Sequence, residues 1–227
     1  MVEWEVIMRI NKNIYIVSLQ RNKRLRNYYA QHRIKGAKFL EISKKSDPKK
    51  ILGGDLIFFL SSKDLSRDVR ETISGMDSNW NLKIAVSTRK LRRLNDVCLT
   101  YIKACKDYKE THLFLKEIIE CIAVPSLVGL DFVDIKQLFM MNSRFELGRY
   151  NTKLSEKDRI VKEIKKRFKK LDGCFLVVNG GADITLDEIN ELARKIGVIS
   201  KYSVLGTRID KHLKGRVELG LYAGWRR

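Results

Sequence analysis

Two short apolar stretches constrain the fold of this chain more than any other feature. Residues 56–60 read Leu-Ile-Phe-Phe-Leu and residues 82–86 read Leu-Lys-Ile-Ala-Val, and turn-forming residues precede each stretch. A strand that is apolar on both faces is typical of a parallel sheet that helices cover on both sides. Residues 65–73, between the two stretches, have the helical periodicity that a crossover connection requires. The sequence therefore predicts an open, Rossmann-like α/β sheet in the first half of the chain.

The remaining pattern predicts two α/β lobes. Further strands are expected at residues 14–19, 37–42, 174–179, 201–205 and 217–222. The last of these alternates like a half-exposed antiparallel strand, and a long helical region is expected over 91–122. Capping-box patterns at Ser155 and Thr185 begin predicted helices that end near Leu171 and Ile196.

Domain boundaries follow from this layout, with the change between lobes near residues 123–130. We expect a first lobe over 1–105, a central helix and linker over 106–130, and a second lobe over 131–227.

Composition excludes several classes of protein. The 227 residues are 44% hydrophobic, with 2 Pro and 14 Gly, so the chain can fill a core and is not of the disordered class. No apolar run reaches the roughly 18 residues that a membrane span needs, and residues 1–5 lack a signal-peptide pattern. We therefore expect a cytoplasmic protein.

Cysteine and histidine spacing predicts no metal cofactor. The four cysteines form no C-x-x-C pair and the three histidines are scattered. Cys105, Cys121 and Cys174 lie among apolar neighbours, where a free thiol behaves as a small hydrophobic group. We therefore expect structural thiols.

Three segments of the second half resemble the FtsZ/tubulin superfamily. Residues 127–136 read LVGLDFVDIK, where FtsZ proteins carry an N-x-D-F-A-D pattern after the central helix. Residues 176–189 read LVVNGGADITLDEI, similar to the strand, glycine-rich turn, D-L-T-L-x-E pattern and helix of the family's second domain. Residues 204–210 and 217–224 resemble that domain's closing strands. The resemblance covers about residues 115–225 and implies an FtsZ/tubulin-like second domain behind a shortened nucleotide-domain-like lobe.

The first lobe lacks the glycines with which the family binds guanine nucleotide. Phosphates must approach backbone N–H groups at a helix N-terminus, and glycine leaves the room for this approach. The corresponding segments here, residues 20–24 and 61–67, contain no glycine. We therefore predict no nucleotide cofactor and no autonomous GTPase activity. A residual enzyme with an altered pocket is also disfavoured, because the sequence offers no other nucleophile–base arrangement.

Asp131 and Asp134 match the acidic pair of the family. The resemblance implies that their loop enters the nucleotide pocket of the next subunit in a filament, where such carboxylates position water and a cation. Gly129 replaces the family's Asn, and Val133 replaces its Ala. The residues also fit a purely structural role, with Asp131 as the N-cap and Asp134 as a first-turn acid of a helix containing Ile135.

Basic residues follow the predicted strands of the first lobe, where a doubly wound sheet normally presents its ligand crevice. They are Arg21, Lys23, Arg24, Lys44, Lys45, Lys63, Arg89, Lys90, Arg92 and Arg93. They could bind a partner or a broad anionic surface, or they could be ordinary solvated charge. Nearby, Tyr28, Tyr29 and His32 could stack on bases or serve as apolar positions of a helix that begins near Lys23.

These observations predict an FtsZ/tubulin-like protein that does not bind nucleotide and acts through protein–protein contacts in a cytoskeletal or cell-division system. Its partner would be itself or a full-length FtsZ, with capping or regulation of FtsZ filaments as the specific hypothesis. The alternative is a module that binds a polyanion, either nucleic acid or an anionic membrane surface. That alternative rests on 46 Lys and Arg against 27 Asp and Glu, a formal net charge of +19.

Overall fold

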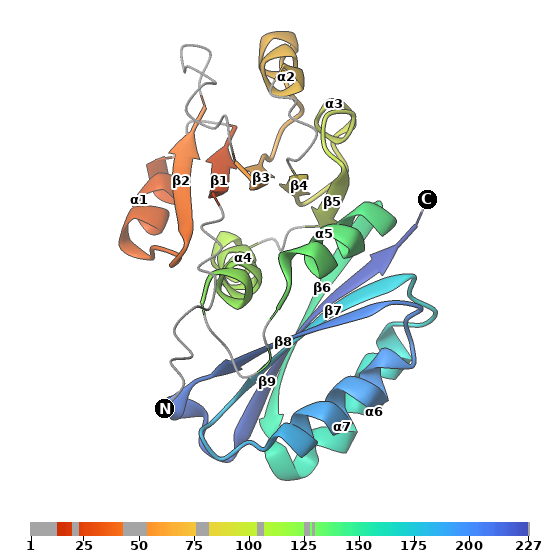
Figure 1. Cartoon of the computed structure of the whole chain (residues 1–227). Helices are drawn as coiled ribbons and strands as arrows, with labels where there is room; N and C mark the ends of the chain where they lie inside the picture. The colour runs from red at the N-terminus through yellow and green to blue at the C-terminus, as the bar shows by residue number, and fades with distance from the viewer. Residues whose placement is uncertain are drawn as a thin grey trace, which may run out of the picture.

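The computed structural model describes residues 13–19, 23–42, 54–75, 82–103, 107–124, 128 and 130–226, and the structural statements below concern these residues. Nine strands in this part of the chain form one sheet with the order β2-β1-β3-β4-β5-β6-β9-β7-β8 (Figure 1). The strands are β1 Ile14–Ser18, β2 Ala37–Glu41, β3 Leu56–Leu60, β4 Leu82–Ser87, β5 Thr100–Lys103, β6 Arg144–Lys153, β7 Gly173–Gly180, β8 Ser203–Ile209 and β9 Arg216–Trp225. The helices are α1 Lys23–Gln31, α2 Arg67–Ser74, α3 Arg92–Asn95, α4 Tyr108–Ala123, α5 Phe132–Met141, α6 Lys157–Arg167 and α7 Leu186–Gly197. Short 3₁₀ turns occupy Leu154–Glu156 and Lys211–Leu213.

The sheet has a parallel part and a mixed part. Strands β1 to β5, with α1 to α3, form what we call the first region, and every strand pair in it is parallel. Strands β6 to β9, with α5 to α7, form the second region, in which β9 is antiparallel to both β6 and β7. The central helix α4 lies between the two regions in the chain. This architecture confirms the predicted α/β class.

The two regions are joined by backbone pairing as well as by α4. Strand β6 pairs in parallel with β5, from Tyr101 opposite Arg144 to Lys103 opposite Glu146. Two lobes linked by a helix were expected, and the sheet instead runs from one region into the other. The domain boundaries at 105 and 130 stay a prediction.

The hydrophobic core differs between the two faces of the sheet. On one face α1, α4 and α5 cover a single core that includes Phe58 of the first region and Phe175 of the second. On the other face there are two cores, one under α2 and α3 and one under α6 and α7. Figure 1 shows α6 and α7 together below the strands of the second region, with α4 and α5 on the opposite side. The described residues thus form one core on the first of these faces and two separate cores on the other.

The prediction of a long helical region over 91–122 is wrong for the first half of that range. Residues 92–95 form only the short α3, and Thr100–Lys103 form the buried strand β5 between β4 and β6. Helix α4 begins at Tyr108, where the Asp107 side chain accepts a hydrogen bond from the backbone N–H of Lys109 at 2.9 Å. Four residues are too few to show a period, so pairing with both neighbours decides the strand.

In the second region the prediction missed β6 and misjudged β9. Strand β6 is rich in polar residues, and it is fixed by ten residue pairs with β9. Strand β9 is antiparallel as expected, but most of its residues are buried rather than half-exposed. Burial on both faces follows from helices on both sides of the sheet.

The two predicted capping boxes have different outcomes. Thr185 forms one, since its hydroxyl accepts from the backbone N–H of Glu188 at 3.2 Å and the Glu188 carboxylate accepts from Thr185. Ser155 does not, because residues 154–156 form a 3₁₀ turn and α6 begins after it without a side-chain cap. Helix α6 also ends before Leu171, since Phe168 is extended and Lys170 has a positive φ of 53°.

Candidate functional site

The acidic pair lies at the exposed start of α5. Asp131 is the N-cap, and its carboxylate accepts a hydrogen bond from the backbone N–H of Val133 at 2.9 Å. Asp134 lies in the first turn, where it accepts from the Tyr202 hydroxyl at 3.4 Å. Negative charge at a helix N-terminus is favourable because the helix dipole is positive there. The structural role of both residues is thus confirmed, and their action on a partner stays a prediction.

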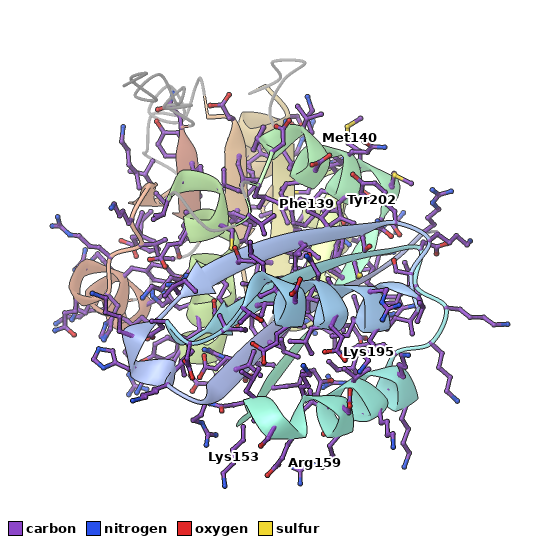
Figure 2. All side chains as sticks on the ribbon, turned by 60° about the horizontal axis from the view of Figure 1, so that its bottom comes forward. Phe139, Met140, Lys153, Arg159, Lys195 and Tyr202 are labelled. Carbon is purple, nitrogen blue, oxygen red and sulfur yellow. The ribbon has the colours of Figure 1, made fainter. Side chains whose placement is uncertain are left out.

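Helix α5 is anchored on one side and bare on the other. Phe132, Ile135, Leu138 and Phe139 are buried in the core shared by both regions. On the outer side Val133 is 62% exposed and Met140 is 59% exposed, and seven residues of a helix bring them to the same face. Figure 2 shows Met140 on the side of α5 away from the sheet. The acidic pair is therefore presented next to apolar side chains on a fixed support.

The segment that leads into α5 is tied to the second region. The backbone N–H of Val128 donates to the hydroxyl of Thr207 at 2.9 Å, and Thr207 is fully buried in β8. A single buried anchor of this kind fixes where the chain enters α5. The helix itself is oriented by the packing of Phe132 and Ile135 in the core shared by both regions.

A buried carboxylate holds α4 against the second region. Glu117 is 2% exposed and lies 3.4 Å from the guanidinium of Arg149, which also pairs with Glu218 at 2.8 Å. Burial raises the pKa of Glu117 to about 7, and the positive charges of Arg149 and Arg208 limit the rise. One turn further along α4, Glu120 pairs with Arg208 of β8. Gly220 provides the room, since a Cβ there would lie 2.4 Å from a Glu117 carboxylate oxygen.

The loop after β3, where the family would hold phosphate, is closed by its own side chains. One carboxylate oxygen of Asp64 accepts from the backbone N–H groups of Leu65 and Arg93, both at 3.0 Å. The Arg93 guanidinium donates to the Leu65 carbonyl at 3.0 Å, and Ser66 caps α2. Asp64 thus occupies two backbone N–H groups at this loop, and the absence of nucleotide binding stays a prediction. Residues 20–22, which follow β1, lie outside the described part of the chain.

The described members of the predicted basic set belong to several elements of the first region. Lys23 and Arg24 begin α1, Lys63 lies in the loop after β3, and Arg92 and Arg93 belong to α3. Arg21, Lys44 and Lys45 lie outside the described residues. Arg89 and Lys90, which are consecutive in the chain, line a hollow of about 530 Å³.

That hollow also contains cations that the sequence did not single out. They are Lys103, Arg144 and Arg226, from β5, the start of β6 and the segment after β9. Lys103 directly follows an apolar pair, Tyr101 and Ile102, which could have indicated a strand end. These three residues lie close together because β5, β6 and β9 are neighbours in the sheet. Neither β5 nor β6 was predicted from the sequence, so the sequence alone could not bring the three residues together.

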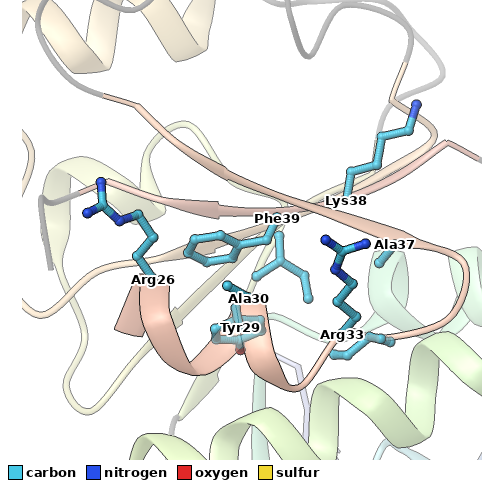
Figure 3. Close-up of a pocket in the computed structure, with 9 residues that line it drawn as sticks. Arg26, Tyr29, Ala30, Arg33, Ala37, Lys38 and Phe39 are labelled. Carbon is cyan, nitrogen blue, oxygen red and sulfur yellow. The ribbon is translucent and has the colours of Figure 1, made fainter. Parts of the chain in front are cut away.

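Tyr28 and Tyr29 occupy positions of α1, as one of the two interpretations expected, and stacking of these aromatic residues on bases stays untested. Tyr29 is 3% exposed and stacks on Phe39, and Tyr28 stacks on His32 with ring centroids 4.1 Å apart. His112 of α4 packs against both tyrosines, and burial lowers its pKa to about 4. Figure 3 shows the hollow of about 340 Å³ beside this cluster, with Arg26, Arg33 and Lys38 around it.

The described cysteines are structural, as expected. Cys98, Cys121 and Cys174 are buried free thiols, and burial raises their pKa to about 12, 12 and 11. Cys105 lies outside the described residues. In the part of the chain that the structure covers, no three His, Cys, Asp or Glu side chains gather as metal ligands would. No helix in that part is long and apolar enough to span a membrane.

Comparisons with known proteins support the resemblance. No protein-family profile matches the chain. It is 26% identical over 120 residues to cell division protein FtsZ 2 of Methanocaldococcus jannaschii, which is 46% of this chain and 31% of the relative. It is 23% identical over 155 residues to FtsZ of Rickettsia conorii, which is 62% of this chain and 34% of the relative. The matches thus span about a third of the length of these relatives.

Solved structures show the same fold over nearly the whole chain. An empty FtsZ dimer from M. jannaschii matches with a TM-score of 0.72 and 16% identity, covering 94% of this chain and 88% of that one. CetZ from Methanosaeta thermophila matches with a TM-score of 0.62 and 13% identity over 95% and 87% of the two chains. CetZ2 of Haloferax volcanii, solved as a protofilament with bound GTPγS, matches with a TM-score of 0.59 and 8% identity over 95% and 94%. The predicted FtsZ/tubulin fold is confirmed.

Proposed function

We propose that this chain, which belongs to the FtsZ/tubulin superfamily by its fold and its sequence similarity to FtsZ, acts through protein–protein contacts of α5 in a cytoskeletal or cell-division system. The observation that carries the proposal is the acidic pair, Asp131 and Asp134, exposed at the start of an anchored helix. A cytoplasmic location and the absence of nucleotide bound in the family's manner belong to the same proposal.

The partner is a full-length FtsZ whose nucleotide end is free. A longitudinal filament contact joins two unlike faces, and growth continues only while each subunit offers both. This chain has the acidic face, whereas Asp64 closes the loop where the phosphate face would be. Docked on a filament end, it would offer no nucleotide to the next subunit. It would therefore cap the filament and limit its length.

The contact would combine charge with apolar burial. Asp131 and Asp134 would enter the partner's pocket, where carboxylates can act on water and a cation near the terminal phosphate. Val133 and Met140, on the same helix, would bury apolar surface against the rim of that pocket.

Filament length in the presence of GTP tests this proposal. A full-length FtsZ is polymerised with substoichiometric amounts of the chain, and filaments are measured by electron microscopy and sedimentation. We expect shorter filaments with the native chain. Asp131→Asn with Asp134→Asn should restore their length, because asparagine keeps the helix cap but removes both negative charges. Met140→Asp should also restore it, by placing a charge in the apolar contact.

A matched control uses the opposite side of the second region. Lys162→Gln with Lys166→Gln changes two exposed charges on α6, away from α5, and should leave capping intact. Unchanged filament length and turnover at equimolar native chain would contradict capping. Sedimentation of the chain alone then shows whether it assembles with itself instead.

A second candidate function, binding of nucleic acid or an anionic membrane, rests on the net charge of +19. Among the described residues, five cations line one hollow, and Arg89 and Lys90 are the members of the predicted basic set that belong to it. Binding to DNA and to anionic vesicles over a salt series would decide it, since a polyanion contact weakens steeply as salt rises.

A further inference from the structure

The hollow lined by Arg89 and Lys90 lies between two cores on the same face of the sheet, the core under α2 and α3 and the core under α6 and α7. Its floor includes Tyr101 of the α2–α3 core, and its far wall includes Trp225, which packs against the α6–α7 core. The family's phosphate loops follow the first strand and β3, whereas this hollow lies beyond the end of β4 and over β5 and β6. It therefore includes neither of the two segments, residues 20–24 and 61–67, that correspond to the family's phosphate loops.

Positive charge converges on the hollow from four separate segments. Arg89 and Lys90 follow β4, Lys103 ends β5, Arg144 begins β6 and Arg226 follows β9. The carboxylate at its edge, Glu146, pairs with both Lys103 and Arg144. Asp172 accepts from the backbone N–H of Arg226 at 3.0 Å and pairs with Lys201 at 2.7 Å. Five cations beside these two carboxylates leave a net positive site, which suits a multiply charged anion.

The hollow also carries groups that select more than charge. The side-chain oxygen of Asn95 is buried and has no hydrogen-bond partner among the described residues. A ligand hydroxyl or amino group could donate a hydrogen bond to this acceptor. Trp225 adds an aromatic wall, with the Arg144 guanidinium 5.5 Å from its ring centre. A volume of about 530 Å³ lies within the usual range for small-molecule sites.

We infer that this hollow binds a small phosphate ester with hydroxyl or amino donors, the chemical class of mononucleotides and sugar phosphates. The cations hold the phosphate groups, and Asn95 accepts a hydrogen bond from a donor of the ligand. Trp225 packs against the sugar or base ring of the ligand. The inference does not rest on the proposed filament contact, because α5 takes no part in lining the hollow.

Titration calorimetry on the full chain tests the inference, with ADP, ribose 5-phosphate, pyrophosphate and inorganic phosphate as probes. We expect one saturable site that binds ADP more tightly than pyrophosphate and binds inorganic phosphate most weakly. Arg89→Gln with Lys90→Gln should weaken ADP and pyrophosphate binding by about tenfold or more, because two charged donors are lost. Both residues are exposed and belong to a surface loop, so the variant should fold.

Two further variants separate this site from general attraction of anions. Asn95→Ala should weaken ADP binding by roughly three- to tenfold and weaken pyrophosphate binding less, since ADP carries ribose hydroxyl and adenine amino donors that pyrophosphate lacks. The α6 variant Lys162→Gln with Lys166→Gln removes the same two charges elsewhere and should change neither ligand.

Four results would overturn the inference. They are no binding of any probe at millimolar concentration and low salt, ADP affinity that survives Arg89→Gln with Lys90→Gln, equal losses in the α6 variant, and saturable binding of single-stranded DNA alone. The last result would instead support the polyanion alternative. None of them would affect the filament test, which depends on α5.

Discussion

The loop after β3 in the first region and the start of α5 in the second region each place a carboxylate beside a helix N-terminus, with opposite results. Asp64 accepts from two backbone N–H groups, one of them from Arg93, and so ties the loop to α3. Asp131 accepts from a backbone N–H of its own helix and stays exposed beside Asp134. The hydrogen bonds of Asp64 hold the loop together, whereas the hydrogen bond of Asp131 within its own helix leaves the carboxylate exposed. Aspartate thus stabilises a loop in the first region and remains an accessible negative charge in the second region.

The largest effect is expected from removing a side chain in the core that the two regions share. Phe175→Ala empties a fully buried position beside Tyr222, and such truncations cost about 3–5 kcal/mol. Because Phe58 of the first region belongs to the same core, we expect one cooperative urea transition that moves as a whole. Two separate transitions, with the first region unaffected, would show that the regions are independent.

The second effect concerns the buried Glu117 of α4. Its pKa is about 7 in the folded chain against an ordinary 4.5, so the folded state binds its proton more tightly over that range. The free energy of unfolding should therefore fall as pH rises from about 4.5 to 7. Glu117→Gln cannot ionise, and above pH 7 it should be more stable than the native chain by up to about 3 kcal/mol. Arg149 keeps its pairing with Glu218 in this variant.

Urea titrations at a series of pH values measure this difference. Glu110→Gln, at an exposed position of the same helix, is the control and should keep the native pH dependence. If Glu117→Gln is less stable than the native chain at high pH, the ionised pair with Arg149 is a net stabilising contact instead.

A smaller effect tests the closed loop of the first region. Asp64→Ala removes the acceptor of two backbone hydrogen bonds, which should cost about 1–2 kcal/mol. Hydrogen exchange at Leu65 and Arg93 should rise, while the N–H of Val133 at the start of α5 should be unchanged. Unchanged exchange at Arg93 would mean that Asp64 does not close the loop.

The smallest effect compares the two capping-box patterns within the second region. Thr185→Ala breaks a reciprocal cap and should cost about 1 kcal/mol. Ser155→Ala removes no cap and should stay within about 0.5 kcal/mol of the native chain. Thermal unfolding of the two variants side by side measures both, and equal losses would contradict the 3₁₀ turn before α6.

Sequence reasoning succeeded for most local signals, with the Ser155 pattern as an exception. The apolar runs of β3 and β4, the Thr185 cap and the Asp131 cap each depend on neighbours within a few residues, and all four are observed. It failed at β5 and β6, whose strand state depends on pairing with β4 and β9 far along the chain. The basic hollow was missed for the same reason, since Lys103 and Arg144 meet only through the β5–β6 pairing.

That pairing also has a mechanical meaning. A hinge between the two regions would have to turn about the chain on either side of α4, yet three residue pairs of β5 and β6 bridge the same junction in a continuous ladder. Rotation of one region against the other must therefore break backbone hydrogen bonds as well as slide α4. A torque applied at α5 would therefore load the β5–β6 ladder as well as α4.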